Sequence, residues 1–171
     1  MEIKQVKHNA VVLVGDYPFA KEVKEEVLSL FIRGVDNLGY TNVKASLHTK
    51  WNWEPDNVRF RNLKEYIREE IETYYKIELL EGHSFWGMSY EKGDYAQSHS
   101  HKPSHYSFAY FVSAKWYHSP LVFTYSKKRI RPKEGRVIAF PSYLMHHVPK
   151  HRYNDVRITL SGNYRLNREG I

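Results

Sequence analysis

The chain has 171 residues, a mass of 20.4 kDa and a net charge of +7 at pH 7. This length suits a single domain that buries a core without disulfides or structural metals. The chain has no cysteine, which excludes a disulfide framework and a thiolate zinc site. A reducing compartment is its simplest location, so we expect a cytoplasmic protein.

The positive charge is concentrated in the C-terminal half. Lys and Arg number 12 against 13 Asp and Glu in residues 1–80, but 14 against 6 in residues 81–171. The C-terminal half should therefore attract an anion, which could equally be nucleic acid, an acidic protein segment or a negatively charged cosubstrate. We interpret the run Lys127–Arg131 as a solvated loop or strand edge, with an acid-binding or phosphate-binding rim as the alternative.

A short strand is predicted at Val11–Val14, near the start of the chain. The apolar run Ala10–Val14 is too short for a signal peptide or a membrane span. We therefore expect no targeting segment and no membrane association.

Two amphipathic helices are predicted in the N-terminal half, at Phe19–Val35 and Leu63–Tyr74, because apolar residues recur there at helical spacing. We expect Asp16 or Tyr17 near the cap of the first helix and Pro18 in its first turn. Both helices should cover one face of a sheet.

From about residue 84 onward the pattern changes to short runs rich in aromatic and β-branched residues. Helices followed only by strands predict an α+β fold, mainly β, in which an antiparallel barrel or jelly roll is buttressed by N-terminal helices. We expect one domain over residues 1–171, with a helical support region at 1–80 and a core barrel at 81–165 that holds the functional site. The predicted strands are Ser84–Tyr90, Tyr95–His101, Tyr106–Ala114, Leu121–Tyr125, Gly135–Phe140, His146–Val148 and Val156–Tyr164.

Three histidines in this half have the spacing of a metal site. Residues two apart on a strand point to the same face, about 7 Å apart, so His99 and His101 can bind one ion from a single strand. His146 follows 45 residues after His101, and a barrel can return such a distant residue beside the first strand. His147 competes with His146, and the register of the strand decides which ring points inward.

Several motifs in this half resemble the Fe(II)- and 2-oxoglutarate-dependent oxygenases. The similarity is greatest to the prolyl-hydroxylase-like branch of small oxygenases from bacteria and phages. It covers roughly residues 84–164, and the order and spacing of the motifs are more specific than any single one. The motifs are Tyr90–Tyr95, His99–His101, Ser107–Val112, Pro132–Arg136, Phe140–Ser142 with His146, and Arg157–Thr159 with Asn163.

The resemblance implies a double-stranded β-helix whose metal is held by His99 and His146, with His101 in a position where the family generally has Asp or Glu. Imidazole is also a suitable iron ligand. Three neutral histidines leave a charge of +2 on a ferrous site, which a 2-oxoglutarate dianion can offset. Zinc, nickel or cobalt could also occupy three imidazoles.

The resemblance also implies a binding site for the cosubstrate. Arg157 and Thr159 lie two apart on the last predicted strand, where the family binds the distal carboxylate of 2-oxoglutarate; a guanidinium offers paired N–H donors to a carboxylate. Tyr90 is a further candidate for contact with the cosubstrate. Tyr110 is a weaker one, because Phe111 could equally occupy that family position.

We therefore expect a non-haem Fe(II)- and 2-oxoglutarate-dependent oxygenase that hydroxylates a C–H bond of a peptide, an amino acid or another small substrate, with O₂ and 2-oxoglutarate as co-reactants. One alternative is a cupin-like three-histidine dioxygenase or metal-binding protein that does not use 2-oxoglutarate. The other is a basic, non-catalytic nucleic-acid-binding module, which would use Lys127–Arg131. His105, His118 and His151 are interpreted as rim residues rather than ligands.

Overall fold

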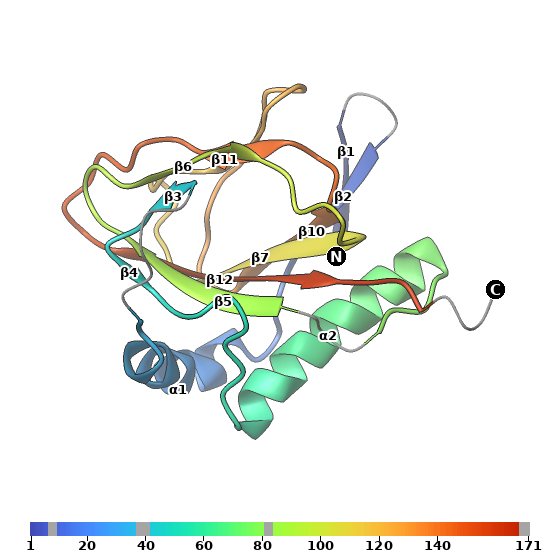
Figure 1. Ribbon diagram of the computed structural model, residues 1–171, viewed down its shortest axis with the longest axis horizontal. Helices are drawn as coiled ribbons and strands as arrows, with labels where there is room; N and C mark the ends of the chain where they lie inside the picture. Colours follow the sequence, from blue (N-terminus) through green and yellow to red (C-terminus); the bar gives the residue numbers. More distant parts are fainter. Residues whose placement is uncertain (7–9, 37–41, 81–83, 168–171) are drawn as a thin grey trace.

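The computed structural model describes residues 1–6, 10–36, 42–80 and 84–167. Two antiparallel sheets face each other, and two helices cover the outer face of the larger sheet (Figure 1). This is the arrangement of a flattened jelly roll buttressed by helices.

The larger sheet has seven strands in the order β1-β2-β10-β7-β12-β5-β4, and its neighbouring strands pair antiparallel. The long strands β7, β12 and β5 form its centre. The strand bounds are β1 Glu2–Val6, β2 Ala10–Asp16, β4 Leu47–His48, β5 Ser84–Tyr90, β7 Tyr106–Ser113, β10 Arg136–Pro141 and β12 Arg157–Tyr164.

The smaller sheet has five strands in the order β3-β6-β11-β8-β9. Strand β6 lies beside β11, and His146 is the register partner of His99. The distant histidine is therefore returned beside the first by strand pairing. The strand bounds are β3 Val43–Lys44, β6 Tyr95–His99, β8 Leu121–Phe123, β9 Lys128–Ile130 and β11 His146–Val148.

The helices are α1, Ala20–Arg33, and α2, Val58–Tyr75. Helix α1 begins after Pro18, and its N-cap residue Phe19 makes no side-chain capping bond. Tyr17 lies two residues before this cap, as the prediction of Asp16 or Tyr17 near the cap allowed, but the prediction of Pro18 in the first turn was wrong. The carboxylate of Asp16 pairs instead with Lys133 and Arg136.

Helix α2 starts five residues before the predicted Leu63, because the side chain of Asn57 caps it by accepting a hydrogen bond from the N–H of Phe60. Helix α1 packs so closely against the larger sheet that the sheet position facing its Phe31 ring must be a glycine. A Cβ atom on Gly87 would lie 2.5 Å from the Phe31 ring of α1.

Side chains alternate between two cores along the central strands of the larger sheet. On β7, Phe108, Tyr110 and Val112 pack under the helices, whereas Phe111 packs between the two sheets. On β5, Phe85 belongs to the helix side, and Trp86, Met88 and Tyr90 face the other sheet. This period of two means that one face of the sheet supports the helices while the other can form a site.

The prediction of a mainly β fold with two sheets and supporting helices is confirmed. Strands β1, β3 and β4 had not been predicted, and β9 falls in the run Lys127–Arg131, which was interpreted as a solvated loop or strand edge. The N-terminal region is thus more than a helical support, since β1, β2 and β4 join the larger sheet and β3 joins the smaller one. The predicted boundary at residues 80 and 81 adjoins residues 81–83, which lie outside the described residues. Neither described helix is long and apolar enough to cross a membrane.

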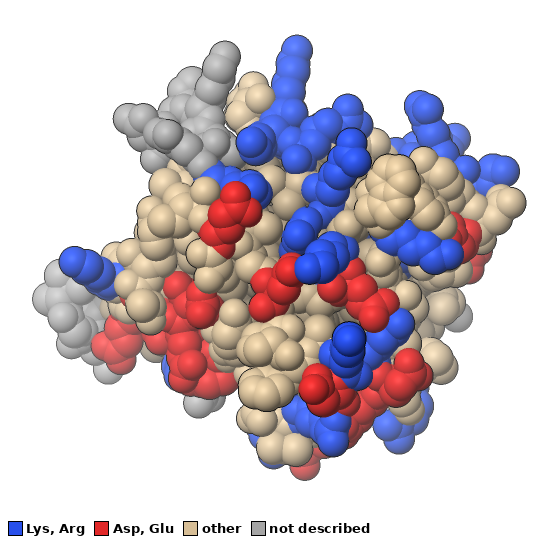
Figure 2. Space-filling model, turned by 180° about the vertical axis from the view of Figure 1, so that it is seen from behind, with Lys and Arg blue, Asp and Glu red and all other residues tan. Residues whose placement is uncertain are grey.

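Lys and Arg side chains gather along the upper edge of the face shown in Figure 2, whereas acidic and basic side chains mix in its lower part. In the run Lys127–Arg131, the side chains of Lys127, Lys128, Arg129 and Arg131 are exposed and that of Ile130 is buried. The run therefore forms the exposed turn and edge strand that its charge indicated.

Candidate active site

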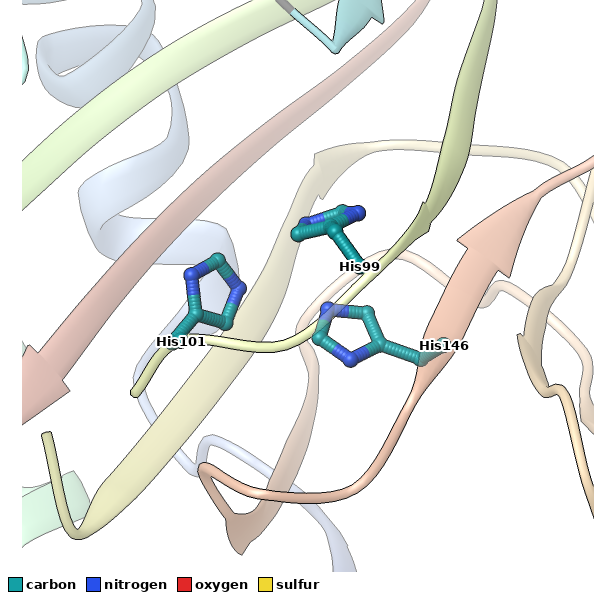
Figure 3. A group of neighbouring side chains, drawn as sticks. All are labelled: His99, His101 and His146. Carbon is teal, nitrogen blue, oxygen red and sulfur yellow. The ribbon is translucent and has the colours of Figure 1, made fainter. Parts of the chain in front are cut away.

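The rings of His99, His101 and His146 meet between the end of β6 and the start of β11 (Figure 3). Their ring centroids lie 4.5–5.0 Å apart. Each ring offers one ligand nitrogen within 4.8 Å of the others. This three-histidine cluster has the composition and the compactness of a site for one transition-metal ion.

Backbone carbonyls determine which nitrogen of two of these rings carries the proton. The Nδ1 atom of His99 lies 2.7 Å from the carbonyl of Gln97, and the Nδ1 atom of His146 lies 2.8 Å from that of Leu144. A ring nitrogen can hydrogen-bond to a carbonyl oxygen only when it carries a proton. In the neutral ring the proton is therefore on Nδ1, and the Nε2 atom keeps its lone pair for a metal. Such outer hydrogen bonds are typical of metal-binding histidines.

The three-histidine cluster is held in its neutral form. Burial lowers the pKa of His101 to about 3, and the nearby ring of His99 adds to this effect. Burial likewise lowers the pKa of His146 and of His99. All three imidazoles are therefore neutral rather than positively charged at pH 7, as a metal-binding histidine must be.

The path of the chain differs in one detail from the prediction. Strand β6 ends at His99, so His101 lies in the following turn rather than on the same strand. The N–H of His101 donates to the carbonyl of Ser142, which fixes that turn beside the segment leading to His146.

Of the two neighbouring histidines on β11, His146 is buried and faces the cluster, whereas Nδ1 of His147 lies 3.1 Å from Oγ1 of Thr124.

A cavity of about 330 Å³ lies beside the three-histidine cluster and is lined by all three rings. The cavity is also lined by Arg157 and Thr159, which alternate with Ile158 and Leu160 of the helix-side core along β12. The described residues that line this cavity include Lys102 and Arg157 but no Asp or Glu. The cavity is therefore suited to an anion.

Arg157 and Thr159 hold unused hydrogen-bonding atoms in the lining of this cavity. Both residues are buried, and within the described part of the chain neither Nε of Arg157 nor Oγ1 of Thr159 has a hydrogen-bond partner. Buried polar atoms normally have partners. These two atoms are therefore donors in this part of the cavity that could still accept a ligand as partner.

The guanidinium of Arg157 is fixed from several sides. Its Nη1 atom donates to the carbonyl of Ser119 at 2.6 Å, and its central carbon lies 4.5 Å from the centroid of the Tyr90 ring and 5.2 Å from that of Phe111. Burial lowers the pKa of Arg157 to about 10, so the group is still charged at neutral pH. A buried cation without a counter-ion is costly, and a bound carboxylate would remove that cost.

The two tyrosine candidates lie on opposite faces of the larger sheet. Tyr90 lines the cavity, and its hydroxyl contacts only the sulfur of Met88 at 3.4 Å among the hydrogen bonds of the described residues. Burial raises its pKa to about 12, so the phenol is neutral and can donate. Tyr110 packs under the helices against Tyr17 instead, and Phe111 faces the site. Tyr110 is therefore not placed to contact a cosubstrate.

A second group of possible ligands, the second cluster, consists of His118, His151 and Asp155. It adjoins Arg157, because Ser119, which follows His118, accepts the hydrogen bond from the guanidinium. The expectation that His118 and His151 are rim residues was wrong, since both are buried. No sequence pattern indicated this group, because its members do not share a strand period.

Trp86 is another residue of the site, and it was not among the predicted metal ligands or cosubstrate contacts. Its indole lines the cavity, and the ring centroid lies 5.5 Å from that of His101. The buried Nε1–H has no partner in the described structure. Its position two residues from Met88 and four from Tyr90 on β5 was the available signal.

Comparison with protein families gives one match. A family model described as "Putative 2OG-Fe(II) oxygenase" matches residues 122–163. This segment runs from β8 to β12 and includes His146, Arg157 and Thr159. No curated protein sequence matches the chain.

Solved structures with this fold include three prolyl hydroxylases. A viral collagen prolyl hydroxylase from Paramecium bursaria Chlorella virus-1, in complex with 2-oxoglutarate, has a TM-score of 0.72 at 12% identity and covers 90% of this chain and 94% of its own. A prolyl-4-hydroxylase from Pseudomonas putida has a TM-score of 0.71 at 12% identity, covering 91% and 92%.

The third is a prolyl hydroxylase from Trichoplax adhaerens, solved with a peptide of a hypoxia-inducible factor oxygen degradation domain. It has a TM-score of 0.66 at 14% identity, covering 90% and 83%. At these identities the likeness establishes the fold, a double-stranded β-helix. The matched segment and the fold together confirm the resemblance indicated by the sequence, to the prolyl-hydroxylase-like 2OG-Fe(II) oxygenases.

Proposed function

We propose that this protein is a non-haem Fe(II)- and 2-oxoglutarate-dependent oxygenase that hydroxylates a C–H bond of its substrate. One observation carries the proposal: three neutral imidazoles and a buried guanidinium with an unpartnered Nε line the same cavity, in which none of the described lining residues is Asp or Glu. A cation site and an anion anchor in one cavity suit a metal-chelating dicarboxylate. The family match over residues 122–163 supports the same activity.

His99, His101 and His146 would hold Fe(II), with the Nε2 atoms of His99 and His146 already oriented by carbonyl hydrogen bonds. With 2-oxoglutarate and O₂, the iron supplies the oxidising chemistry, in which one oxygen atom enters the substrate while 2-oxoglutarate becomes succinate and CO₂. The protein contributes ligand geometry, charge balance and exclusion of water.

Arg157 and Thr159 would bind the distal carboxylate of 2-oxoglutarate through the unpartnered Nε–H and the Thr hydroxyl. Tyr90 would add a neutral phenol donor from β5. Since the described lining residues provide no carboxylate, the dianion would also supply the negative charge that three imidazoles do not give to the metal.

The substrate that we propose is a peptide, an amino acid or another small molecule. Trp51 and Lys102 also line the cavity, and a second cavity of about 590 Å³, lined by Tyr75, Tyr106 and Tyr143, shares Lys102 with it. This neighbouring space supports a substrate that extends beyond the metal. The solved structures with a similar fold include one prolyl hydroxylase in complex with a peptide fragment.

An anaerobic titration tests the proposal. Adding 2-oxoglutarate to the Fe(II)-loaded protein should give the visible charge-transfer band of a metal-bound keto acid, and His99→Ala should abolish it. His105→Ala is the matched control, because His105 lines the second cavity and is not part of the three-histidine cluster. A wild-type protein that binds Fe(II) but gives no band with 2-oxoglutarate would contradict the proposal and favour the dioxygenase that does not use this cosubstrate.

A further inference from the structure

The second cluster of His118, His151 and Asp155 has the composition of a metal site, but its hydrogen bonds place a proton on one of the required atoms. The backbone N–H of Lys115 donates to Nδ1 of His118 at 3.2 Å. The proton of the neutral ring must then sit on Nε2, which lies 3.2 Å from Oδ1 of Asp155. That nitrogen therefore has no lone pair to offer a metal, and it lies near the carboxylate without an aligned hydrogen bond to it.

Asp155 joins His118 to two further groups of the same loop. Its Oδ2 atom accepts from the hydroxyl of Tyr117 at 2.6 Å and lies 2.8 Å from Nζ of Lys115. One carboxylate thus contacts Lys115, Tyr117 and His118, which lie between β7 and β8. The backbone N–H of His118 also donates to the carbonyl of Lys115, so this turn is closed on itself.

The turn ends at the residue that orients the cosubstrate arginine. Ser119 follows His118 directly, and its carbonyl accepts from Nη1 of Arg157. Asp155 precedes Arg157 by two residues. The short segment that contains Asp155 and Arg157 is therefore tied to the loop twice, once through each of these side chains.

His151 supports the segment from the other side. Its Nε2–H donates to the backbone carbonyl of Asp155 at 2.9 Å, and its ring centroid lies 4.9 Å from that of His118. Its backbone N–H donates to the carbonyl of Asp94. The imidazoles therefore fill a buried junction in which they fix the chain direction just before β12.

We propose that Lys115, Tyr117, His118 and Asp155 form a brace that positions the guanidinium of Arg157 for the distal carboxylate of 2-oxoglutarate. These are positioning residues, since they act on the ligand through Ser119 and Arg157. The inference rests on the proposed function, because it needs 2-oxoglutarate as the ligand of Arg157. Without the brace, the carbonyl of Ser119 loses its fixed place and the guanidinium loses its orientation.

The test compares two keto acids on the Ni(II)-loaded protein by calorimetry. 2-Oxoglutarate reaches Arg157, whereas pyruvate has the same chelating end but lacks the distal carboxylate. Asp155→Ala should raise the Kd for 2-oxoglutarate about tenfold, as loss of an outer-shell partner commonly does. The Kd for pyruvate and the Ni(II) affinity should not change. In the Fe(II)-loaded protein, kcat for turnover at saturating 2-oxoglutarate should also be unchanged, so the kinetic effect should appear in the KM for 2-oxoglutarate alone.

Three further variants make the result specific. Asp155→Asn keeps an oxygen that accepts from Tyr117 and should give an intermediate Kd. Tyr117→Phe removes one hydrogen bond to Asp155 and should raise the Kd for 2-oxoglutarate less than Asp155→Ala does. This variant replaces Asp155→Ala in the test if Asp155→Ala does not fold. Asp16→Ala is the matched control, because Asp16 also pairs with two cations, Lys133 and Arg136, but lies away from the brace; its Kd should equal that of the wild type.

Three results would overturn the brace. The first is an unchanged Kd for 2-oxoglutarate in Asp155→Ala. The second is equal weakening of 2-oxoglutarate and pyruvate, which indicates general disruption. The third is a second equivalent of Ni(II) in the wild type that Asp155→Ala removes, which would make the second cluster a metal site. A wild-type protein that binds no 2-oxoglutarate would refute the proposed function and the brace together.

Discussion

The protein contains two histidine clusters of similar composition that differ in which ring nitrogen carries the proton. In the three-histidine cluster, carbonyls accept from Nδ1 of His99 and His146, so lone pairs face the centre. In the second cluster, a backbone N–H donates to Nδ1 of His118, so a proton faces Asp155. The comparison teaches that neighbouring backbone groups, rather than side-chain composition, decide which cluster can bind a metal.

The largest expected effect separates the two histidines of β11. His146→Ala should reduce Fe(II) or Ni(II) binding below detection, because two imidazoles are a poor site for either ion. His147→Ala should bind metal like the wild type, since its ring contacts Thr124 instead. Calorimetric titration of both variants measures the difference, and loss of metal in His147→Ala alone would reverse the assignment.

The next effect concerns the cavity wall. Arg157→Leu should weaken 2-oxoglutarate binding about a hundredfold, because a charge-assisted pair with a carboxylate is lost. The ligand-free variant should be no less stable than the wild type, since an unpaired buried cation is replaced by an apolar group. Arg129→Leu, at an exposed position of β9, is the control. Calorimetry and thermal unfolding give both quantities, and a normal Kd in Arg157→Leu would refute the anchor.

A third experiment removes a ring from the second cluster. His151→Ala should lower the free energy of unfolding by about 2 kcal/mol, as expected for a buried side chain that loses a hydrogen bond and leaves a cavity. The His151→Ala variant should still bind one metal ion per chain, as the wild type is expected to do. Denaturant titration and metal analysis check both parts. A variant that takes up less metal than the wild type would contradict the division of roles between the clusters.

Acid should weaken the metal-free protein through both clusters. Burial lowers the pKa of His101 to about 3 and also lowers that of His118. Below pH 6.5 the unfolded chain therefore binds protons that the folded chain does not, so stability falls by up to about 1.4 kcal/mol per pH unit for each such histidine. His101→Asn should reduce the slope of stability against pH between 6.5 and 5. An unchanged slope would show that His101 titrates normally in the fold.

The smallest effect is expected at Tyr90. Tyr90→Phe removes a hydroxyl that contacts only Met88 among the hydrogen bonds of the described residues, so the stability of the ligand-free protein should change by less than about 0.5 kcal/mol. The Kd for 2-oxoglutarate should rise about threefold if the phenol donates one neutral hydrogen bond. An unchanged Kd would leave Tyr90 as a wall of the cavity and a ring beside Arg157.

The sequence was informative wherever a strand period applied. Ser84–Tyr90 was predicted with its observed bounds, and the period of two correctly placed Arg157 and Thr159 on one face of β12. The proposed metal ligands came from a motif, since the turn that carries His101 has no strand period. The family resemblance supplied the role of Arg157, which spacing alone could not have given.

Other features depended on contacts between distant segments. Strands β3 and β4 have two residues each and form only by pairing with β6 and β5. Tyr110 could be placed on the helix side only after the register of β7 was known. The second cluster combines His118 with His151 and Asp155, so no local pattern announces it.

The lack of a carboxylate among the described residues that line the cavity has a thermodynamic consequence. A divalent ion on three neutral ligands gains from a dianion beside it, and the dianion gains equally from the ion. By linkage, the factor by which metal tightens 2-oxoglutarate must equal the factor by which 2-oxoglutarate tightens metal. The two should therefore bind cooperatively, so that cells poor in the keto acid would leave the enzyme short of iron as well.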